Sequence, residues 1–121
     1  LGLKEQYCGT FDLLFAARGK DGVIRPFLAD WKTNKDLTSD YNRAHGNMML
    51  PPFDYLVDEP LSHYTLQLSL YAMGLEQLGY EMTHKIIIWL RIIKSADFLT
   101  VRSPLIPCVN LNRQAQKFLN T

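Results

Sequence analysis

Two apolar stretches separated by a short segment rich in Gly and Asp dominate the first third of this 121-residue chain. Residues 11–17 are apolar or small, apart from Asp12, and residues 23–31 form a second stretch of the same kind. The segment between them, residues 18–22, has the composition of a hairpin turn. The pattern therefore predicts two neighbouring antiparallel strands whose turn is centred near Asp21.

This hairpin would bring chemically active side chains together. A turn centred near Asp21 places Asp12 opposite Asp30, and Lys32 shares a face with Asp30 because residues two apart on a strand point the same way. Pro26 or a bulge would shift that register by one residue. Two opposed carboxylates repel, and one would take up a proton unless a cation lay between them. Magnesium, which prefers oxygen ligands, resolves the conflict, so the pair favours a metal site.

Each of these residues also has a simpler structural interpretation. Considered alone, Asp12 would end a turn, and Asp30 would pair with Lys32 or an arginine at a strand edge. The simpler interpretation is favoured for either aspartate by itself, and the metal site is favoured for the opposed pair. In that site Lys32 would stabilise the charge of the reacting phosphate or hold the attacking water.

A second cluster lies on a predicted helix over residues 62–78, with Ser62 as its N-cap and Gly79 as its stop signal. Gln67 and Tyr71 are four residues apart and share one face of this helix. That face is suited to hydrogen-bond a nucleic-acid backbone, or it is an ordinary amphipathic surface with a half-buried tyrosine. The apolar stripe toward the core is predicted to consist of Leu66, Leu70, Met73 and Leu78.

The remaining elements predict an α/β fold with a mixed β-sheet. Further elements are expected as a strand over 85–93, a strand over 98–102 and a short helix over 112–119. Residues 34–61 form a long irregular insertion, and connections of this length inside a domain are usually functional or mobile. The whole chain, residues 1–121, is predicted to be one domain.

Bulk properties restrict the classes of function. The formal net charge of +1 gives no general attraction to nucleic acid, so DNA binding would need a local basic patch. The longest apolar stretch, residues 86–90, is too short to cross a bilayer, and residues 1–5 lack the pattern of a signal peptide. No partner in a membrane is therefore expected. Trp31 and Trp89 are predicted to pack in the core.

Cysteine and histidine spacing argues against several cofactors. Cys8 and Cys108 lie far apart in the sequence and cannot assemble a zinc site or an iron–sulfur cluster by themselves. One sparse pair of cysteines fits a reducing cytoplasm, which is the expected location. The three histidines lack the spacing of a catalytic zinc site.

Together these residues resemble the PD-(D/E)XK nuclease superfamily, in its branch of RecB-type and phage exonucleases. Residues 9–14, Gly-Thr-Phe-Asp-Leu-Leu, resemble the family's G-x-x-D strand. Residues 30–33, Asp-Trp-Lys-Thr, resemble its (D/E)-x-K strand, and residues 67–71 resemble its Q-x-x-x-Y helix. The match spans roughly residues 8–93, with the order and spacing of the motifs intact.

The resemblance implies a restriction-endonuclease-like core, with a central mixed sheet flanked by helices, and cleavage of DNA that depends on Mg²⁺ or Mn²⁺. By the motif match, Asp12, Asp30 and the main-chain carbonyl of Trp31 would be metal ligands. Lys32 would be the catalytic lysine.

Further implications follow from the same match. Gln67 and Tyr71 would orient the catalytic lysine or hold the DNA strand. The family usually has a helix before the first strand that completes the site, and this chain begins too late to show it. Some RecB-type members carry four cysteines around an iron–sulfur cluster, whereas this chain has two, which implies a member without a cluster.

The leading hypothesis is a divalent-metal DNA nuclease, an exonuclease of recombination, repair or phage replication. Its expected partner is DNA, and a homo-oligomer or a larger recombination or replication assembly is a possible setting. The alternative is a catalytically inactive DNA-binding or scaffold domain with the nuclease fold. A third hypothesis is an RNA-directed endonuclease with the same fold.

Overall fold

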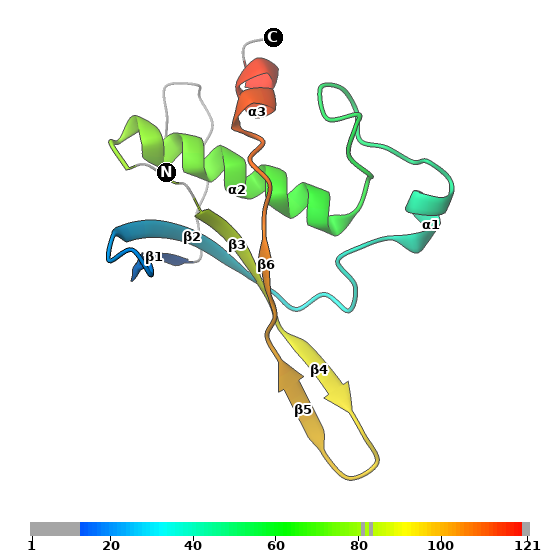
Figure 1. Ribbon diagram of the computed structural model, residues 1–121. Coiled ribbons are helices and arrows are strands. Elements are labelled where there is room, and N and C mark those ends of the chain that lie inside the picture. Colours follow the sequence, from blue (N-terminus) through cyan, green and yellow to red (C-terminus); the bar gives the residue numbers. More distant parts are fainter. Residues whose placement is uncertain (1–12, 81, 83, 120–121) are drawn as a thin grey trace.

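The fold was described from a computed structural model, which defines residues 13–80, 82 and 84–119 and, among these, the side chains up to residue 115. Figure 1 shows a sheet with a long helix across one face and a separate β-hairpin that extends from the body. The elements in chain order are β1 (Leu13–Arg18), β2 (Ile24–Lys32), α1 (Asp40–Ala44), α2 (Pro60–Gln77), β3 (His84–Trp89), β4 (Arg91–Lys94), β5 (Leu99–Arg102), β6 (Leu105–Pro107) and α3 (Asn112–Leu119).

The main sheet of the described residues has four strands in the order β1-β2-β3-β6. β2 and β3 run parallel, and the chain passes from one to the other through α1 and α2. β1 pairs antiparallel with β2, and β6 pairs antiparallel with β3. The predicted α/β fold with a mixed sheet is therefore confirmed.

The β1–β2 hairpin has the predicted turn position. Leu13 lies opposite Ala29, and each later pair keeps the same register, so the hairpin is centred on Asp21. The Asp21 carboxylate accepts a hydrogen bond from the backbone N–H of Val23 at 3.0 Å. Gly22 has a φ of 79°, a left-handed conformation that glycine adopts without steric cost. The composition of residues 18–22 thus encodes this turn.

Pro26 does not shift the register of this hairpin. It pairs with Ala16 of β1, whereas the ladder between β2 and β3 begins one residue later, at Phe27. Proline lacks a backbone N–H, and it is tolerated where a strand has an open edge on one side.

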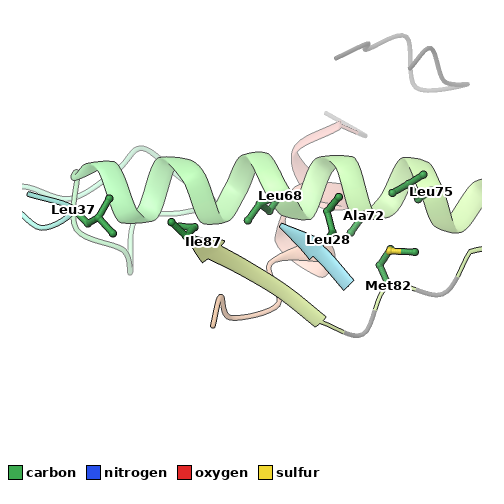
Figure 2. Close-up of a cluster of buried hydrophobic side chains, with 7 residues drawn as sticks. All are labelled: Leu28, Leu37, Leu68, Ala72, Leu75, Met82 and Ile87. Atoms are coloured by element: carbon green, nitrogen blue, oxygen red, sulfur yellow. The ribbon is translucent and has the colours of Figure 1, made fainter. Parts of the chain in front are cut away.

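The largest hydrophobic core lies between α2 and the sheet. Figure 2 shows Leu28 and Ile87 of the strands facing Leu68, Ala72 and Leu75 of α2. Leu28, Leu68 and Ile87 are at most 1% exposed. Burial of one such side chain stabilises the fold by about 1.5–3 kcal/mol, so this contact fixes how α2 lies on β2 and β3.

α2 begins earlier than predicted. Its N-cap is Glu59, its first residue is Pro60, and Ser62 is a buried residue inside the first turn rather than the cap. Proline is favourable at the first helical position because its missing N–H would have no partner there. Gly79 ends the helix as predicted, with a φ of 96° just after the C-cap residue.

The predicted apolar stripe of α2 was only partly right. Leu78 is 60% exposed, so its assignment to the core was wrong. Met73 is buried in a second cluster with Phe53 and Ala115, and Leu66 and Leu70 pack against that cluster. The helix therefore buries one face against the sheet and another against the 34–61 insertion and α3.

The predicted strand over 85–93 is two strands in two different sheets. β3 ends at Trp89, and the N–H of Leu90 donates to the carbonyl of Lys32 at 2.8 Å. β4 then leaves the main sheet and pairs only with β5. The strand predicted over 98–102 corresponds to β5, and α3 has the predicted range.

Two short elements had no sequence prediction. α1 lies inside the 34–61 insertion, where the hydroxyl of Ser39 accepts from the N–H of Asn42 and caps the helix. β6 follows the β4–β5 hairpin and adds the last strand of the main sheet. Within the described part of the chain, no helix has the length and apolarity to span a membrane.

Candidate functional site

The predicted acidic and basic residues of β2 form an ion pair on the face that α2 covers. Asp30 follows the core residue Leu28 by two positions, so it points toward the helix, and it is 7% exposed. The Nζ of Lys32 lies 2.8 Å from Oδ2 of Asp30. A carboxylate in such an environment needs a partner, and Lys32 supplies a positive charge. This ion pair is what the simpler interpretation of Asp30 predicted.

Tyr64, which the sequence motifs did not identify, contacts the ammonium of Lys32. The Nζ of Lys32 lies 4.1 Å from the ring centre of Tyr64, a cation–π contact. The Tyr64 hydroxyl donates to Oδ1 of Asn34 at 3.1 Å. Tyr64 stands three residues before Gln67 and seven before Tyr71, so helical spacing from the Gln–Tyr motif was the signal that could have identified it.

Gln67 and Tyr71 form the predicted pair on one face of α2. Nε2 of Gln67 donates to the hydroxyl of Tyr71 at 2.9 Å. Tyr71 and Tyr64 also pack against the core between α2 and the sheet. The helix therefore presents an aromatic and amide stripe to the sheet face of Lys32, with Tyr64 as the member that contacts this lysine.

Trp31 was predicted to pack in the core, and this prediction was wrong. Its side chain lies on the strand face opposite to Asp30 and Lys32, and the residue is 46% exposed. Trp31 is exposed because side chains alternate along β2, so that only one of two successive residues can face α2. The prediction that its main-chain carbonyl is a metal ligand concerns the backbone and stays a prediction. Trp89 packs against the core as predicted.

A second lysine, Lys85, is buried on the same face of the sheet. Lys85 is 4% exposed, and it pairs in register with Leu28 of β2. Its ammonium donates to the side-chain oxygens of Ser69, Asn110 and Asn112 at 3.1–3.4 Å. Burial lowers the pKa of Lys85, and the charges of Glu76 and Cys108 oppose that shift. These contacts join β3 to α2 and the C-terminal segment, which is a structural role that the sequence did not indicate.

Glu59, near the end of the 34–61 insertion, holds the beginning of this segment by hydrogen bonds. Its carboxylate accepts from the N–H of Ser39 at 3.0 Å and from the Arg43 guanidinium at 2.8 Å twice. The hydrogen bonds from Arg43 lower the pKa of Glu59, against the effect of burial. The segment that follows Lys32 is thus held against the start of α2.

The donor set for a metal is incomplete within the described residues. Asp30 supplies one buried carboxylate, and no group of three or more His, Cys, Asp or Glu side chains comes together in the part of the chain that the structure defines. Asp12 lies outside the described residues, so the predicted pairing of Asp12 with Asp30 stays a prediction. A buried carboxylate beside a lysine is a donor type that Mg²⁺ accepts, and a second carboxylate would be needed to hold the ion.

Comparisons of the chain with protein-family models, with curated proteins and with solved structures found no match. The sequence motifs and the geometry of Asp30, Lys32, Tyr64, Gln67 and Tyr71 therefore carry the information on function.

Proposed function

We propose that this chain is a divalent-metal-dependent DNA nuclease with a restriction-endonuclease-like core, in the class of exonucleases that serve recombination, repair or phage replication. The observation that supports this most strongly is the 2.8 Å approach of Lys32 to Asp30 on the buried face of β2. A (D/E)-x-K strand needs the two side chains on one face and close together, because the carboxylate and the ammonium must serve the same phosphate.

The proposed metal site requires one residue beyond the described part of the chain. Asp12 is next to Leu13, and a β1–β2 ladder continued by one pair would bring it opposite Asp30. Asp12, Asp30 and the main-chain carbonyl of Trp31 would then hold Mg²⁺ or Mn²⁺. When bound, such an ion neutralises phosphate charge and lowers the pKa of a bound water.

The other residues have roles that their own contacts support. The Lys32 ammonium would stabilise the negative charge that develops on the phosphate, and the Tyr64 ring limits where that ammonium can lie. The hydrogen bond from Gln67 to Tyr71 orients the tyrosine hydroxyl, whose hydrogen remains available to a phosphate oxygen or to a water.

Degradation of linear DNA tests the proposal. Purified protein is expected to degrade linear duplex DNA in MgCl₂ and to lose this activity in EDTA. Asp30→Asn, which removes charge but keeps shape, and Lys32→Ala should each abolish degradation. Exposed residues outside the motifs provide matched controls, and Asp54→Asn and Lys20→Ala should retain full activity.

Two results would refute the nuclease. The first is full activity of Asp30→Asn or Lys32→Ala, which would show that another protein or site causes the degradation. The second is no degradation of duplex or single-stranded DNA in Mg²⁺ or Mn²⁺ by a protein that is folded by circular dichroism. Parallel reactions on an RNA of the same sequence separate DNA from RNA specificity.

A second candidate function is a catalytically inactive DNA-binding or scaffold domain. The observation that favours it is that Lys32 already neutralises the one carboxylate of the described site. Calorimetric titration separates the two candidates. Binding of Mn²⁺ that disappears in Asp12→Asn and Asp30→Asn supports the enzyme, whereas DNA binding without any metal binding supports the scaffold.

A further inference from the structure

A groove begins where the Asp30–Lys32 strand ends. Its walls are residues 33–36, which follow Lys32 directly, and residues 90–94, which include β4. The groove has a volume of about 490 Å³. Asn34 anchors the first wall, because its backbone carbonyl accepts from Nε1 of Trp89 at 2.7 Å and its side chain accepts from Tyr64. The candidate site and the groove therefore share one fixed segment.

The charged side chains of this groove are predominantly cationic. Lys35, Arg91 and Lys94 line it together with a single carboxylate, that of Asp36. All four residues are exposed, and none of the three cations forms an ion pair with a carboxylate of the described residues. The guanidinium of Arg91 lies 4.6 Å from the ring centre of Trp89, which holds it at the base of the hairpin. The chain as a whole has a formal charge of only +1, so this is a local basic patch.

The base of the β4–β5 hairpin adds a further positive charge beside the groove. Arg91 lies directly opposite Arg102 in the register of the two strands. Like charges in direct opposition destabilise a strand pair, and an anion between them removes that cost. The one carboxylate of the hairpin, Asp97, lies in the turn at its tip.

The hairpin also carries apolar side chains that the described residues leave in solvent. Ile92, Leu99 and Val101 are 64–65% exposed, and Phe98 at the turn is 68% exposed. Figure 1 shows the hairpin extending away from α2 and the main sheet. A two-stranded hairpin alone is marginally stable in water, so a partner that covers these side chains would stabilise it.

We propose that the groove binds the sugar–phosphate backbone of a single nucleic-acid strand, which passes from the Asp30–Lys32 site onto the β4–β5 hairpin. Lys35, Arg91 and Lys94 contact the phosphates, and Phe98 with its apolar neighbours gives the bases a stacking surface. Cations along a groove combined with exposed aromatic and apolar side chains are how single strands are bound without sequence preference. This inference rests on the proposed nuclease function, because it assigns the path of that substrate.

The geometry favours one strand over a duplex. A volume of about 490 Å³ falls within the range of about 300–1,000 Å³ that holds one small ligand, a size comparable to a nucleotide and far below that of a double helix. The exposed apolar side chains also match unpaired bases, whose faces are open, better than they match the polar edges that a duplex presents in its grooves.

Binding measured without metal tests this inference separately from catalysis. Fluorescence anisotropy of a fluorescein-labelled oligothymidylate is recorded in EDTA over a series of KCl concentrations. The double variant Lys35→Ala/Lys94→Ala should bind about tenfold more weakly and lower the slope of log K against log [KCl] by about 1.4, since each phosphate contact on a single strand contributes about 0.7. Phe98→Ala should bind about tenfold more weakly with an unchanged slope.

A control with matched charge is Lys20→Ala/Arg113→Ala, which removes two exposed cations from the β1–β2 turn and from α3. It should keep the affinity and the slope of the wild type. Equal losses in the two double variants would overturn the groove assignment, as would a wild type that does not bind the oligonucleotide. Unlabelled duplex is expected to compete about tenfold less well, and stronger competition by duplex would overturn the assignment to a single strand.

Two further measurements complete the test. Sedimentation should give the same mass for the wild type and Val101→Lys, and a dimer that this substitution dissociates would assign the hairpin to a second copy of the chain. The second measurement is DNA degradation in Mg²⁺. A protein that binds the oligonucleotide in EDTA but does not degrade DNA in Mg²⁺ would contradict the proposed nuclease function and leave the binding groove standing.

Discussion

The ammonium of Lys32 lies 4.1 Å from the centre of the Tyr64 ring, so a helix residue determines where a strand residue can place its charge. Lys32 comes from β2 and Tyr64 from α2, which are separated in the chain by residues 33–59. Lysine has a long and flexible side chain, and it loses rotamer entropy when it is held in one position. The ring contact and the ion pair with Asp30 together offset that loss, and the packing of α2 on the sheet sustains both.

The contact with Tyr64 leads to a first prediction. Tyr64→Leu should lower the rate of DNA degradation about fivefold, because loss of a cation–π contact worth about 1 kcal/mol lets the ammonium move. Tyr64→Phe keeps the ring and should stay within about twofold of the wild type. Initial rates on linear DNA in Mg²⁺ measure both, and equal rates for Leu and Phe would show that the ring does not position Lys32.

Metal binding should stabilise the folded protein through Asp30. Mn²⁺ at one hundred times its dissociation constant raises the free energy of unfolding by about 2.7 kcal/mol if it binds only the native state. Thermal melting should therefore show an increase in Tm with MnCl₂ for the wild type and for Asp54→Asn, and none for Asp30→Asn. An equal increase in all three proteins would place the metal elsewhere.

The stability contributed by Glu59 should depend on pH. Its pKa in the folded protein is held below the usual value of 4.5, first by the hydrogen bonds from Arg43. A depressed carboxyl pKa stabilises the fold above the unfolded pKa, and this contribution is lost as the pH falls through the folded pKa. Glu59→Gln should therefore be less stable by about 1–3 kcal/mol at neutral pH and should approach the wild type in acid. Urea unfolding across this pH range measures the difference, and a gap that does not change with pH would contradict the role assigned to the charge.

Packing of α2 on the sheet should depend strongly on Leu68, which is 1% exposed. Leu68→Ala should lower the free energy of unfolding by about 2–5 kcal/mol, because it loses buried area and leaves a cavity. Leu50→Ala removes the same atoms from a residue that is 83% exposed, and it should change stability by no more than about 0.5 kcal/mol. Comparable losses in both variants, measured by urea unfolding, would show that Leu68 is not part of the core.

Local sequence patterns predicted the elements whose formation depends on neighbours in the chain. The turn around Asp21, the stop at Gly79 and the range of α3 were all confirmed, because turn chemistry, left-handed glycine and helical composition act over a few residues. The alternation along β2 also placed Lys32 on the face of Asp30, since that alternation is a property of any extended strand.

Predictions that depended on contacts between distant segments were less successful. The strand expected over 85–93 is interrupted at Leu90, where the backbone bonds to Lys32, a residue far away in the sequence. Leu78 and Trp31 are apolar, yet they lie on faces that α2 and β2 do not bury. Composition gives the apolar residues but not which face of an element meets its neighbour, so apolar character alone misplaced them.

The sequence by itself determined the hairpin, its centre and the order of the residues that resemble a nuclease motif, because these follow from short-range preferences of the backbone. Only the tertiary structure decided that Tyr64 contacts Lys32, that Lys85 is buried among polar partners, and that a basic groove starts at the end of β2. These relationships arise when α2 packs on β2 and β3 and when β4 leaves the sheet. The physical reason is that burial of apolar area selects which distant faces meet, and that choice belongs to the whole chain rather than to any one segment.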